Sequence, residues 1–487
     1  MVCEMVLLIL LLLPLLTATL LVVTRPTNAA RAIALASSLV TLGLALWLWH
    51  TYTGQPVTVI DHDWMPAWGL RIVLGYDGTG LLMLLLTALM FPFIIAAGFK
   101  QDLRHPSFVN ALLLYSQSFL LGVFMAQNAF LFYIFYELAL LPVFFLLLYW
   151  GGERRRAITV RFFIYTLLGG LSLLFGIAYC VVQEPSHSAD FVKLAALNLP
   201  FDVQVWLFWA MFLAFAIKLP IFPFHSWQPD TYTMAPLQGT MVLAGVMLKM
   251  GLYGTLKLVF PIVPLGTEHW RELVIWLSII GAIYAAVIAF RQRDLKRLVA
   301  YSSLSHVGIL TAGLFAWNSY GVSGSLYQAF AHAVLVIAML YIVGVVKDRV
   351  GSSEIGAMGG MKLKTPRLAA LFLLVLLNAV ALPMTQSFVG EWLMFNGLWQ
   401  LEGGSWMALA AVSTIVLGAI YMLYAYQRVM LGPDRWKLEI ADADRNDHLF
   451  LVPLIAITLV LGVHPQPILD LVNGPVQQML SNLTALN

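Results

Sequence analysis

Six ionisable residues lie inside apolar segments, and they are the side chains of this sequence best suited to chemistry. Lys218 is the clearest case, because it is the only charged residue in the run Phe212–Pro220. A charge at the centre of a bilayer costs about 2.5–3.5 kcal/mol on insertion scales, and residues that bear this cost usually serve ion or proton transport. Both signs of charge occur in the set. The pattern therefore predicts a proton path through Glu137, Lys218, Lys249, His306, His332 and Glu391.

Glu137 and Lys218 are expected to act as one unit. Burial in lipid favours the neutral form of each group, whereas an opposite charge nearby favours the ionised form. A pair balanced in this way can pass a proton after a small change in the local field. We expect their charged atoms within about 10 Å, directly or through a short bridge. The alternative is a static ion pair that fixes helix packing.

Lys249 and the two buried histidines have more than one interpretation. Lys249 lies near the middle of its apolar segment, and an interfacial lysine that extends to the membrane surface is the alternative. Histidine suits a relay because its ordinary pKa is close to neutrality. Either His306 or His332 alone could be a hydrogen-bonding core residue, but two in consecutive segments favour a relay. We expect these residues and Glu391 to lie near the membrane midplane.

His225 follows a helix break and has two equally open interpretations. It could guard a proton entrance on the inner face, or it could cap exposed backbone. The histidines do not predict a metal site, because no third ligand lies close in the sequence. The two cysteines, Cys3 and Cys180, are too few for a disulfide framework or an iron–sulfur cluster. No glycine-rich phosphate loop is present. Nucleotide binding is therefore unsupported.

The segments that position these residues are membrane helices. The chain has 487 residues, of which 61% are hydrophobic and 10% charged, whereas soluble domains carry about 25% charged residues. Lipid excludes irregular backbone, and continuous apolar runs of about 20 residues indicate helices. We expect about fourteen spans, the first of them a helix rather than a signal peptide, at residues 4–24, 31–50, 80–98, 108–126, 128–149, 160–183, 203–225, 238–260, 271–290, 297–316, 322–346, 368–395, 405–428 and 448–470.

The basic residues support this topology. With the N-terminus outside, most of the 27 Lys and Arg residues fall in inner loops, as the positive-inside rule requires. The sequence thus predicts a multi-pass protein of a bacterial cytoplasmic membrane with both termini on the periplasmic face. Because topology explains the basic residues, no nucleic-acid partner is expected.

Two of the spans are interrupted, which indicates an internal repeat. One break lies at Lys218–Pro220 and the other at Leu382–Pro383. Proline kinks a helix, and paired broken helices in matching halves mark transport sites. An offset of five spans reverses direction across the bilayer. We therefore expect an all-α membrane protein with two inverted five-helix repeats and broken helices 7 and 12. The expected regions are 1–107 (helices 1–3), 108–260 (helices 4–8), 261–430 (helices 9–13) and 431–487 (helix 14 and tail).

Several motifs resemble the antiporter-like membrane subunits of bacterial NADH:quinone oxidoreductase, respiratory complex I. They lie at Phe135–Pro142, Lys218–Asp230, Ala235–Lys249 and Asp294–Gly308. The resemblance extends from residue 77 to residue 467. A glutamate at 391, where the L and N types place lysine, and a short C-terminal region favour the M type. The chain departs from the family pattern at Gln228, Thr231, Tyr232 and Met384.

The resemblance implies that redox chemistry occurs in other subunits while this chain moves protons. The implied path runs through Glu137, Lys218, Lys249, then His306 or His332, to Glu391 as the exit-side group. Neighbouring membrane subunits of the complex are the implied partners, and no cofactor is implied. A subunit of a multi-subunit cation/proton antiporter, a membrane-bound hydrogenase subunit and a structural subunit that has lost pumping are the alternatives. Glu391 disfavours the antiporter, and the intact buried charges disfavour the structural subunit.

Overall fold

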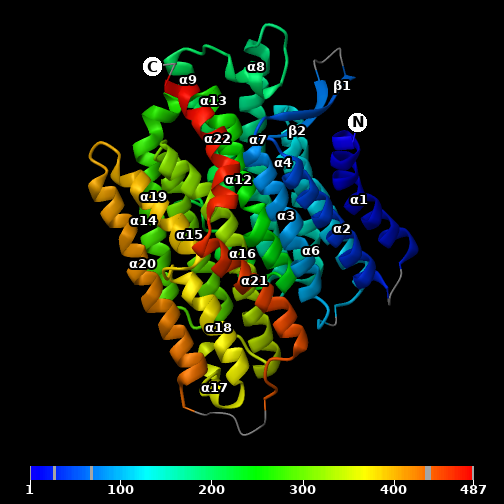
Figure 1. Ribbon diagram of the computed structural model, residues 1–487, viewed down its shortest axis with the longest axis vertical. Coiled ribbons are helices and arrows are strands. Elements are labelled where there is room, and N and C mark those ends of the chain that lie inside the picture. Colours follow the sequence, from blue (N-terminus) through cyan, green and yellow to red (C-terminus); the bar gives the residue numbers. More distant parts are fainter. Residues whose placement is uncertain (1, 26–28, 66–69, 102, 434–439, 485–487) are drawn as a thin grey trace. The chain divides into compact units, whose positions relative to one another are not determined.

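The computed structural model describes residues 2–25, 29–65, 70–101, 103–433 and 440–484 (Figure 1). The chain forms two compact units, which we describe separately. Unit 1 comprises Met1–Leu219, Met234–Leu273 and Asp470–Asn487. Unit 2 comprises Pro220–Thr233 and Val274–Leu469. The four regions expected from the sequence are defined by counting helices along the chain, whereas the two units are defined by packing. The four regions stay a prediction.

Unit 1 is built mainly from helices that pack lengthwise. Its long helices bury nearly all of α3 and α4, whereas α1 and α7 leave Leu16 and Phe175 exposed. The elements are α1 (Val2–Thr24), α2 (Ala30–Thr51), β1 (Val57–Met65), β2 (Leu70–Tyr76), α3 (Gly78–Ala97), α4 (Pro106–Met125), α5 (Ala129–Leu138), α6 (Leu140–Trp150), α7 (Arg155–Gln183), α8 (Phe191–Ala195), α9 (Phe201–Lys218), α11 (Leu237–Val242), η2 (Leu243–Met247), α12 (Lys249–Gly254), η3 (Thr255–Val259), α13 (Phe260–Ile262) and most of α22 (Gln466–Thr484).

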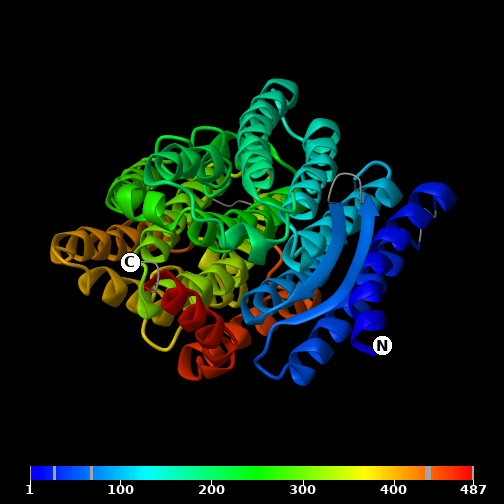
Figure 2. The same cartoon turned by 90° about the horizontal axis from the view of Figure 1, so that it is seen from above.

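A β-hairpin is an addition that the sequence analysis did not anticipate. Strands β1 and β2 pair antiparallel, with Val57 opposite Tyr76 and register shifts at two points. Figure 2 shows the curved pair beside the blue helices α1 and α2. Residues 471–487, interpreted as a tail, also contain structure, because most of α22 lies there. Both elements are shorter or less apolar than a membrane span, so a search for long apolar runs misses them.

Unit 2 is centred on α16, which is buried along almost its whole length and packs on α15, α19 and α21. Small residues allow the closest approach: a Cβ at Gly397 of α19 would lie 2.5 Å from the Gly321 backbone. Such contacts are typical of membrane helix pairs. The elements are α10 (Gln228–Met234), α15 (Leu295–Phe315), α16 (Ser319–Val350), η4 (Ile355–Ala357), α17 (Met361–Lys364), α18 (Pro366–Ala379), α19 (Gln386–Trp399), α20 (Ser405–Tyr426), η5 (Gln427–Leu431) and α21 (Arg445–Val463); α14 (Pro264–Phe290) connects the units.

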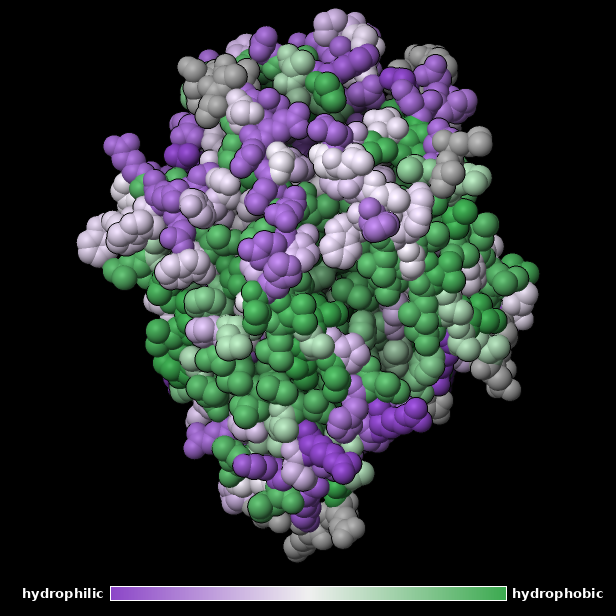
Figure 3. Space-filling view, in the orientation of Figure 1, coloured by the Kyte–Doolittle hydropathy of each residue, from purple (hydrophilic) through white to green (hydrophobic). Residues whose placement is uncertain are grey.

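The long apolar helices agree with the expected spans. Among the described residues, 13 helices are long and apolar enough to cross a membrane. The remaining expected span, 368–395, is divided into α18 and α19, and each half is only 14 residues long. Apolar residues also cover a broad area in the middle of the face shown in Figure 3, and hydrophilic residues gather towards the top and bottom of this view. The expected multi-pass helical fold is therefore confirmed.

The two expected helix breaks are present. Helix α9 ends at Lys218, and the chain turns through residues 219–227 before α10 begins. Helix α18 ends at Ala379, and α19 begins only at Gln386. The inverted relation between the two five-helix groups stays a prediction. The structure adds a third irregularity, since the span 237–262 contains two π-helical stretches, η2 and η3.

Candidate functional site

Glu137 lies at the end of α5, immediately before a helix break. Pro142 cannot donate a backbone hydrogen bond, and its ring crowds the carbonyl of Leu138. The helix is therefore interrupted at Ala139, whose N–H donates to the carbonyls of Glu137 and Phe135. Position 170 on α7 also shapes the site. A Cβ at Gly170 would overlap the Glu137 carboxylate, so the missing side chain makes room for the acid.

Lys218 ends α9 and is only 2% exposed. Its Nζ lies 5.1 Å from the centre of the Tyr136 ring, in a cation–π arrangement. Tyr136 is held by a hydrogen bond of 3.1 Å from its hydroxyl to the Ala214 carbonyl. Within the described chain, neither Lys218 Nζ nor Glu137 Oε1 has a hydrogen-bond partner. The Glu137 and Lys218 charges interact electrostatically without a direct ion pair.

Lys249 begins α12 and is fully buried between the two π-helical stretches. Its Nζ donates to the Ala244 carbonyl at 2.9 Å. A Cβ at Gly251 would lie 3.3 Å from the Lys218 Cβ, so this glycine lets α12 approach the end of α9. π-Helical turns are rare and often occur at functional sites. Unit 1 thus brings Glu137, Lys218 and Lys249 together on adjoining helices.

Unit 2 brings His306, His332 and Glu391 into one cluster. His306 Nδ1 of α15 shares a hydrogen bond of 3.1 Å with Glu391 Oε1 of α19. His332 Nε2 of α16 shares a hydrogen bond of 3.0 Å with Ser303 Oγ. The two imidazole rings lie 6.2 Å apart. His306 and Glu391 are therefore joined directly, and His332 lies beside them with its own hydrogen bond to Ser303.

Two small cavities flank His306. One, of about 10 Å³, is lined by His306, Glu391 and Tyr421, among others. The second, also about 10 Å³, is lined by His306, His332, Ser302 and Ser303, among others. A cavity of this size has room for about one water molecule, which needs at least two polar partners in the lining. The second cavity offers these at its serine and histidine side chains, although most of its lining is apolar. His306 therefore borders both cavities, one that contains Glu391 in its lining and one that contains His332.

His225 does not join that cluster. It lies in the turn after the α9 break, in unit 2, where its ring contacts Phe222 and Tyr284 at centroid distances of 5.6 and 5.3 Å. Its Nδ1 is buried and lacks a hydrogen-bond partner among the described residues. The part of the chain that the structure describes contains no group of three His, Cys, Asp or Glu residues placed to hold a metal ion.

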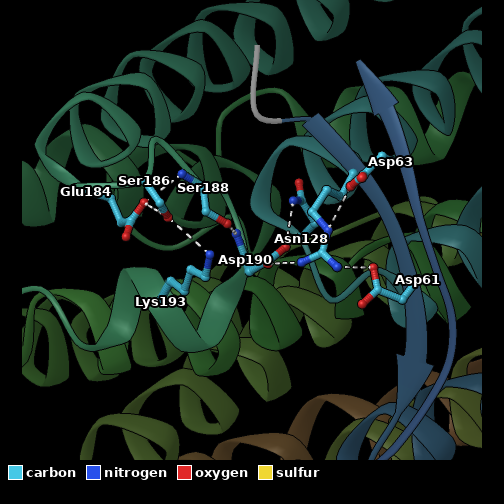
Figure 4. Close-up of polar contacts among 9 residues, drawn as sticks. Asp61, Asp63, Asn128, Glu184, Ser186, Ser188, Asp190 and Lys193 are labelled. Atoms are coloured by element: carbon cyan, nitrogen blue, oxygen red, sulfur yellow. Dashed lines mark hydrogen bonds and ion pairs between the residues drawn. The ribbon is translucent and has the colours of Figure 1, made fainter. Parts of the chain in front are cut away.

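Polar networks outside the spans are a feature that the sequence analysis missed. Arg71 of β2 lies among three carboxylates: its guanidinium lies 2.5 Å from Asp61, 3.3 Å from Asp63 and 3.1 Å from Asp190. Figure 4 shows these three aspartates together with Asn128. Asn128, which caps the start of α5, donates to Asp190 at 3.1 Å. These contacts fasten the hairpin to the helix that carries Glu137.

A second network joins α3 to the helix that carries Lys249. Asp77 caps α3 by accepting from the Gly80 N–H at 2.9 Å and forms an ion pair with Lys257 of η3. Burial alone would raise the pKa of the Asp77 carboxyl, but Lys257 and the hydrogen bonds from Gly80 and Thr79 lower it below its ordinary value. The pair therefore fixes η3 to the start of α3.

The helical fold, the broken helices and the buried ionisable residues together define a multi-pass, antiporter-like membrane subunit. Residues 126–418 match the family model described as NADH:quinone oxidoreductase/Mrp antiporter, transmembrane. The chain is 34% identical over 455 residues to NADH-quinone oxidoreductase subunit M of Rickettsia bellii, covering 92% of this chain and 91% of the relative. The chain belongs to the family of NADH-quinone oxidoreductase subunit M.

Solved structures agree with this assignment. A chain of respiratory complex I from Thermus thermophilus with bound NADH superposes with a TM-score of 0.89 at 28% identity. The match covers 97% of this chain and 99% of that one. A chain of the Mrp complex from Dietzia sp. superposes with a TM-score of 0.82 at 23% identity, over 95% of this chain and 51% of that one, and shows a shared fold.

Proposed function

We propose that this chain moves protons across a bacterial cytoplasmic membrane as a subunit of NADH:quinone oxidoreductase, with the redox chemistry located in other subunits. The observation that supports this most is the hydrogen bond between Glu391 and His306, two titratable groups whose side chains are only 9% and 12% exposed. His306 lies in a helix long and apolar enough to cross a membrane, and Glu391 lies in α19, the second half of the broken span. A buried pair of this kind is costly to keep unless it moves charge. Membership of the subunit M family supports the coupling to quinone reduction.

The proposed path uses both units in turn. In unit 1 a proton is taken up at Glu137 and Lys218 and passes to Lys249. In unit 2 it passes through His306 or His332 and leaves through Glu391. His225 guards the inner entrance. The chain itself needs no cofactor, since each step is a proton transfer between side chains or through water.

The proposed orientation places both termini on the periplasmic side, in agreement with the basic inner loops. Neighbouring antiporter-like subunits are the proposed partners. Cation/proton exchange is the competing function, because a chain of the Mrp complex shares this fold. The ion dependence of pumping tests it. We expect NADH-driven proton pumping to be independent of sodium and potassium.

The direct test is Glu137→Gln in the assembled complex. The substitution keeps the shape of the side chain and removes its titration, so NADH oxidation should persist while most proton pumping supported by this subunit is lost. Proton uptake into vesicles at a fixed rate of NADH oxidation measures this. Glu184→Gln is the matched control, because Glu184 follows α7 outside the spans and accepts from the Ser188 N–H at 2.7 Å. Pumping retained at Glu137→Gln would contradict the proposed function.

A further inference from the structure

The hydroxyl groups of Tyr421 and Ser302 connect the two cavities that flank His306, in addition to the connection that His306 itself makes. Tyr421 of α20 lines the cavity on the Glu391 side, and Ser302 of α15 lines the cavity on the His332 side. The Tyr421 hydroxyl donates to Ser302 Oγ at 2.9 Å. Tyr421 is 1% exposed and Ser302 is 3% exposed. The pair is therefore a buried hydroxyl bridge that runs from one cavity to the other.

At the Ser302 end of the bridge, the neighbouring polar groups are Ser303 and His332. Ser303, next to Ser302 in α15, lines the same cavity and shares a hydrogen bond of 3.0 Å with His332 Nε2. At the other end, Tyr421 and Glu391 line one cavity. Since each cavity has room for about one water molecule, one water on each side would complete the connection.

His306 forms the first connection between the same two cavities. Its Nδ1 is bonded to Glu391, whereas its Nε2 is buried and has no hydrogen-bond partner in the described chain. A proton that crosses at His306 must reach Nε2 and leave from Nδ1. The ring also lines both cavities. The hydroxyl bridge and the His306 imidazole are thus two separate connections between the same two cavities.

We propose that Tyr421 and Ser302 carry protons between His332 and Glu391 in parallel with His306. The inference rests on the proposed proton path and adds a second route within unit 2. In the outward step both hydroxyls are rotated so that Ser302 donates to Tyr421. Ser302 accepts a proton from the histidine side, passes its own proton to Tyr421, and Tyr421 releases its proton toward Glu391. Each oxygen gains one proton and loses one, so the bridge stays neutral, and rotation of both hydroxyls restores the starting arrangement.

A structural clamp between α20 and α15 is the competing interpretation. A single hydrogen bond between membrane helices contributes only modestly to stability. A clamp of that strength would affect assembly or stability slightly, and its loss would not depend on His306. Parallel routes behave differently, because either one can carry protons when the other is removed. The dependence between the two positions therefore separates the interpretations.

The experiment is a double-mutant cycle in the whole complex, with protons pumped per NADH oxidised as the readout. If both routes carry similar traffic, Tyr421→Phe and His306→Gln should each lower this ratio by roughly twofold, and the double variant should lose most of it. Tyr327→Phe is the matched control. Its hydroxyl is also buried in unit 2 and donates to the Leu461 carbonyl at 2.6 Å, so it should pump normally.

Two results would overturn the proposal. One is a double variant that pumps no worse than His306→Gln alone. The other is complete loss in His306→Gln, which would mean that the hydroxyls carry nothing by themselves. If Tyr421→Phe prevents assembly, Ser302→Ala removes the other half of the bridge and carries the same expectations. Glu391→Gln distinguishes the two levels: if it blocks pumping while the double variant pumps no worse than His306→Gln alone, only the parallel route fails.

Discussion

Unit 1 and unit 2 bury their ionisable groups in different surroundings. In unit 1, Lys218 Nζ lies over the Tyr136 ring and has no hydrogen-bond partner among the described residues. In unit 2, Glu391 is bonded to His306, and His332 is bonded to Ser303. A charge held by an aromatic face and a distant opposite charge responds strongly to a change in the local field. Groups joined by hydrogen bonds instead allow a proton to move in short steps.

The difference suggests a division of labour. We infer that unit 1 decides when a proton is accepted, because the balance between Glu137 and Lys218 depends on their mutual field. Unit 2 conducts the proton, because its groups and cavities are nearly continuous. If this is correct, steric changes should be most damaging in unit 1, whereas unit 2 should keep part of its pumping when either His306 or Tyr421 alone is lost.

The largest loss of proton pumping should come from Gly170→Ala in unit 1. The added Cβ would overlap the Glu137 carboxylate and force it to move, so the field between Glu137 and Lys218 would change. We expect loss of most pumping with quinone reduction retained, measured as protons per electron in vesicles. Gly43→Ala is the control, since a Cβ at Gly43 meets no atom within 4 Å. Normal pumping in Gly170→Ala would remove the steric argument for unit 1.

A smaller effect is expected from the aromatic neighbour of Lys218. Tyr136→Phe keeps the ring and loses only the hydrogen bond to Ala214, which is worth about 1 kcal/mol. Tyr136→Leu loses the ring as well. Pumping should therefore fall clearly in the leucine variant and little in the phenylalanine variant. Equal losses in both variants would show that the hydroxyl, rather than the ring, supports Lys218, and would make unit 1 resemble unit 2.

The smallest effect concerns the Asp77–Lys257 pair outside the relay. Because the pKa of Asp77 is lowered in the folded chain, the pair stabilises it above the ordinary pKa of aspartate, about 3.9, and this contribution is lost as pH falls through the lowered value. Asparagine caps helices almost as well as aspartate, so Asp77→Asn removes mainly the charge. We expect a lower thermal midpoint at pH 7 and a shrinking difference from the parent as pH decreases. Asp63→Asn, at an exposed carboxylate, should change the midpoint less.

The sequence could predict the spans, both helix breaks and the buried ionisable residues, because each leaves a local mark such as an apolar run, a proline or a charge. It could not predict which residues meet. Gly170 and Tyr421 are unremarkable in the sequence, and they matter only because α7 faces α5 and α20 packs beside α15. The hairpin was missed since β1 includes Asp61 and Asp63 and lacks a long apolar pattern. The π-helical stretches around Lys249 likewise depend on packing that no local pattern records.

The central claim, that buried ionisable groups carry the protons, is tested most directly at Glu391. Glutamine at this position keeps the size of the side chain and can still bond to His306, but it cannot exchange a proton. The measurement is the number of protons pumped per electron by the assembled complex in vesicles, with NADH oxidation monitored in the same sample. We predict a reduced ratio in Glu391→Gln, with partial retention in Glu391→Asp. An unchanged ratio in the glutamine variant would contradict the account and leave Glu391 as a residue that packs α19 against α15.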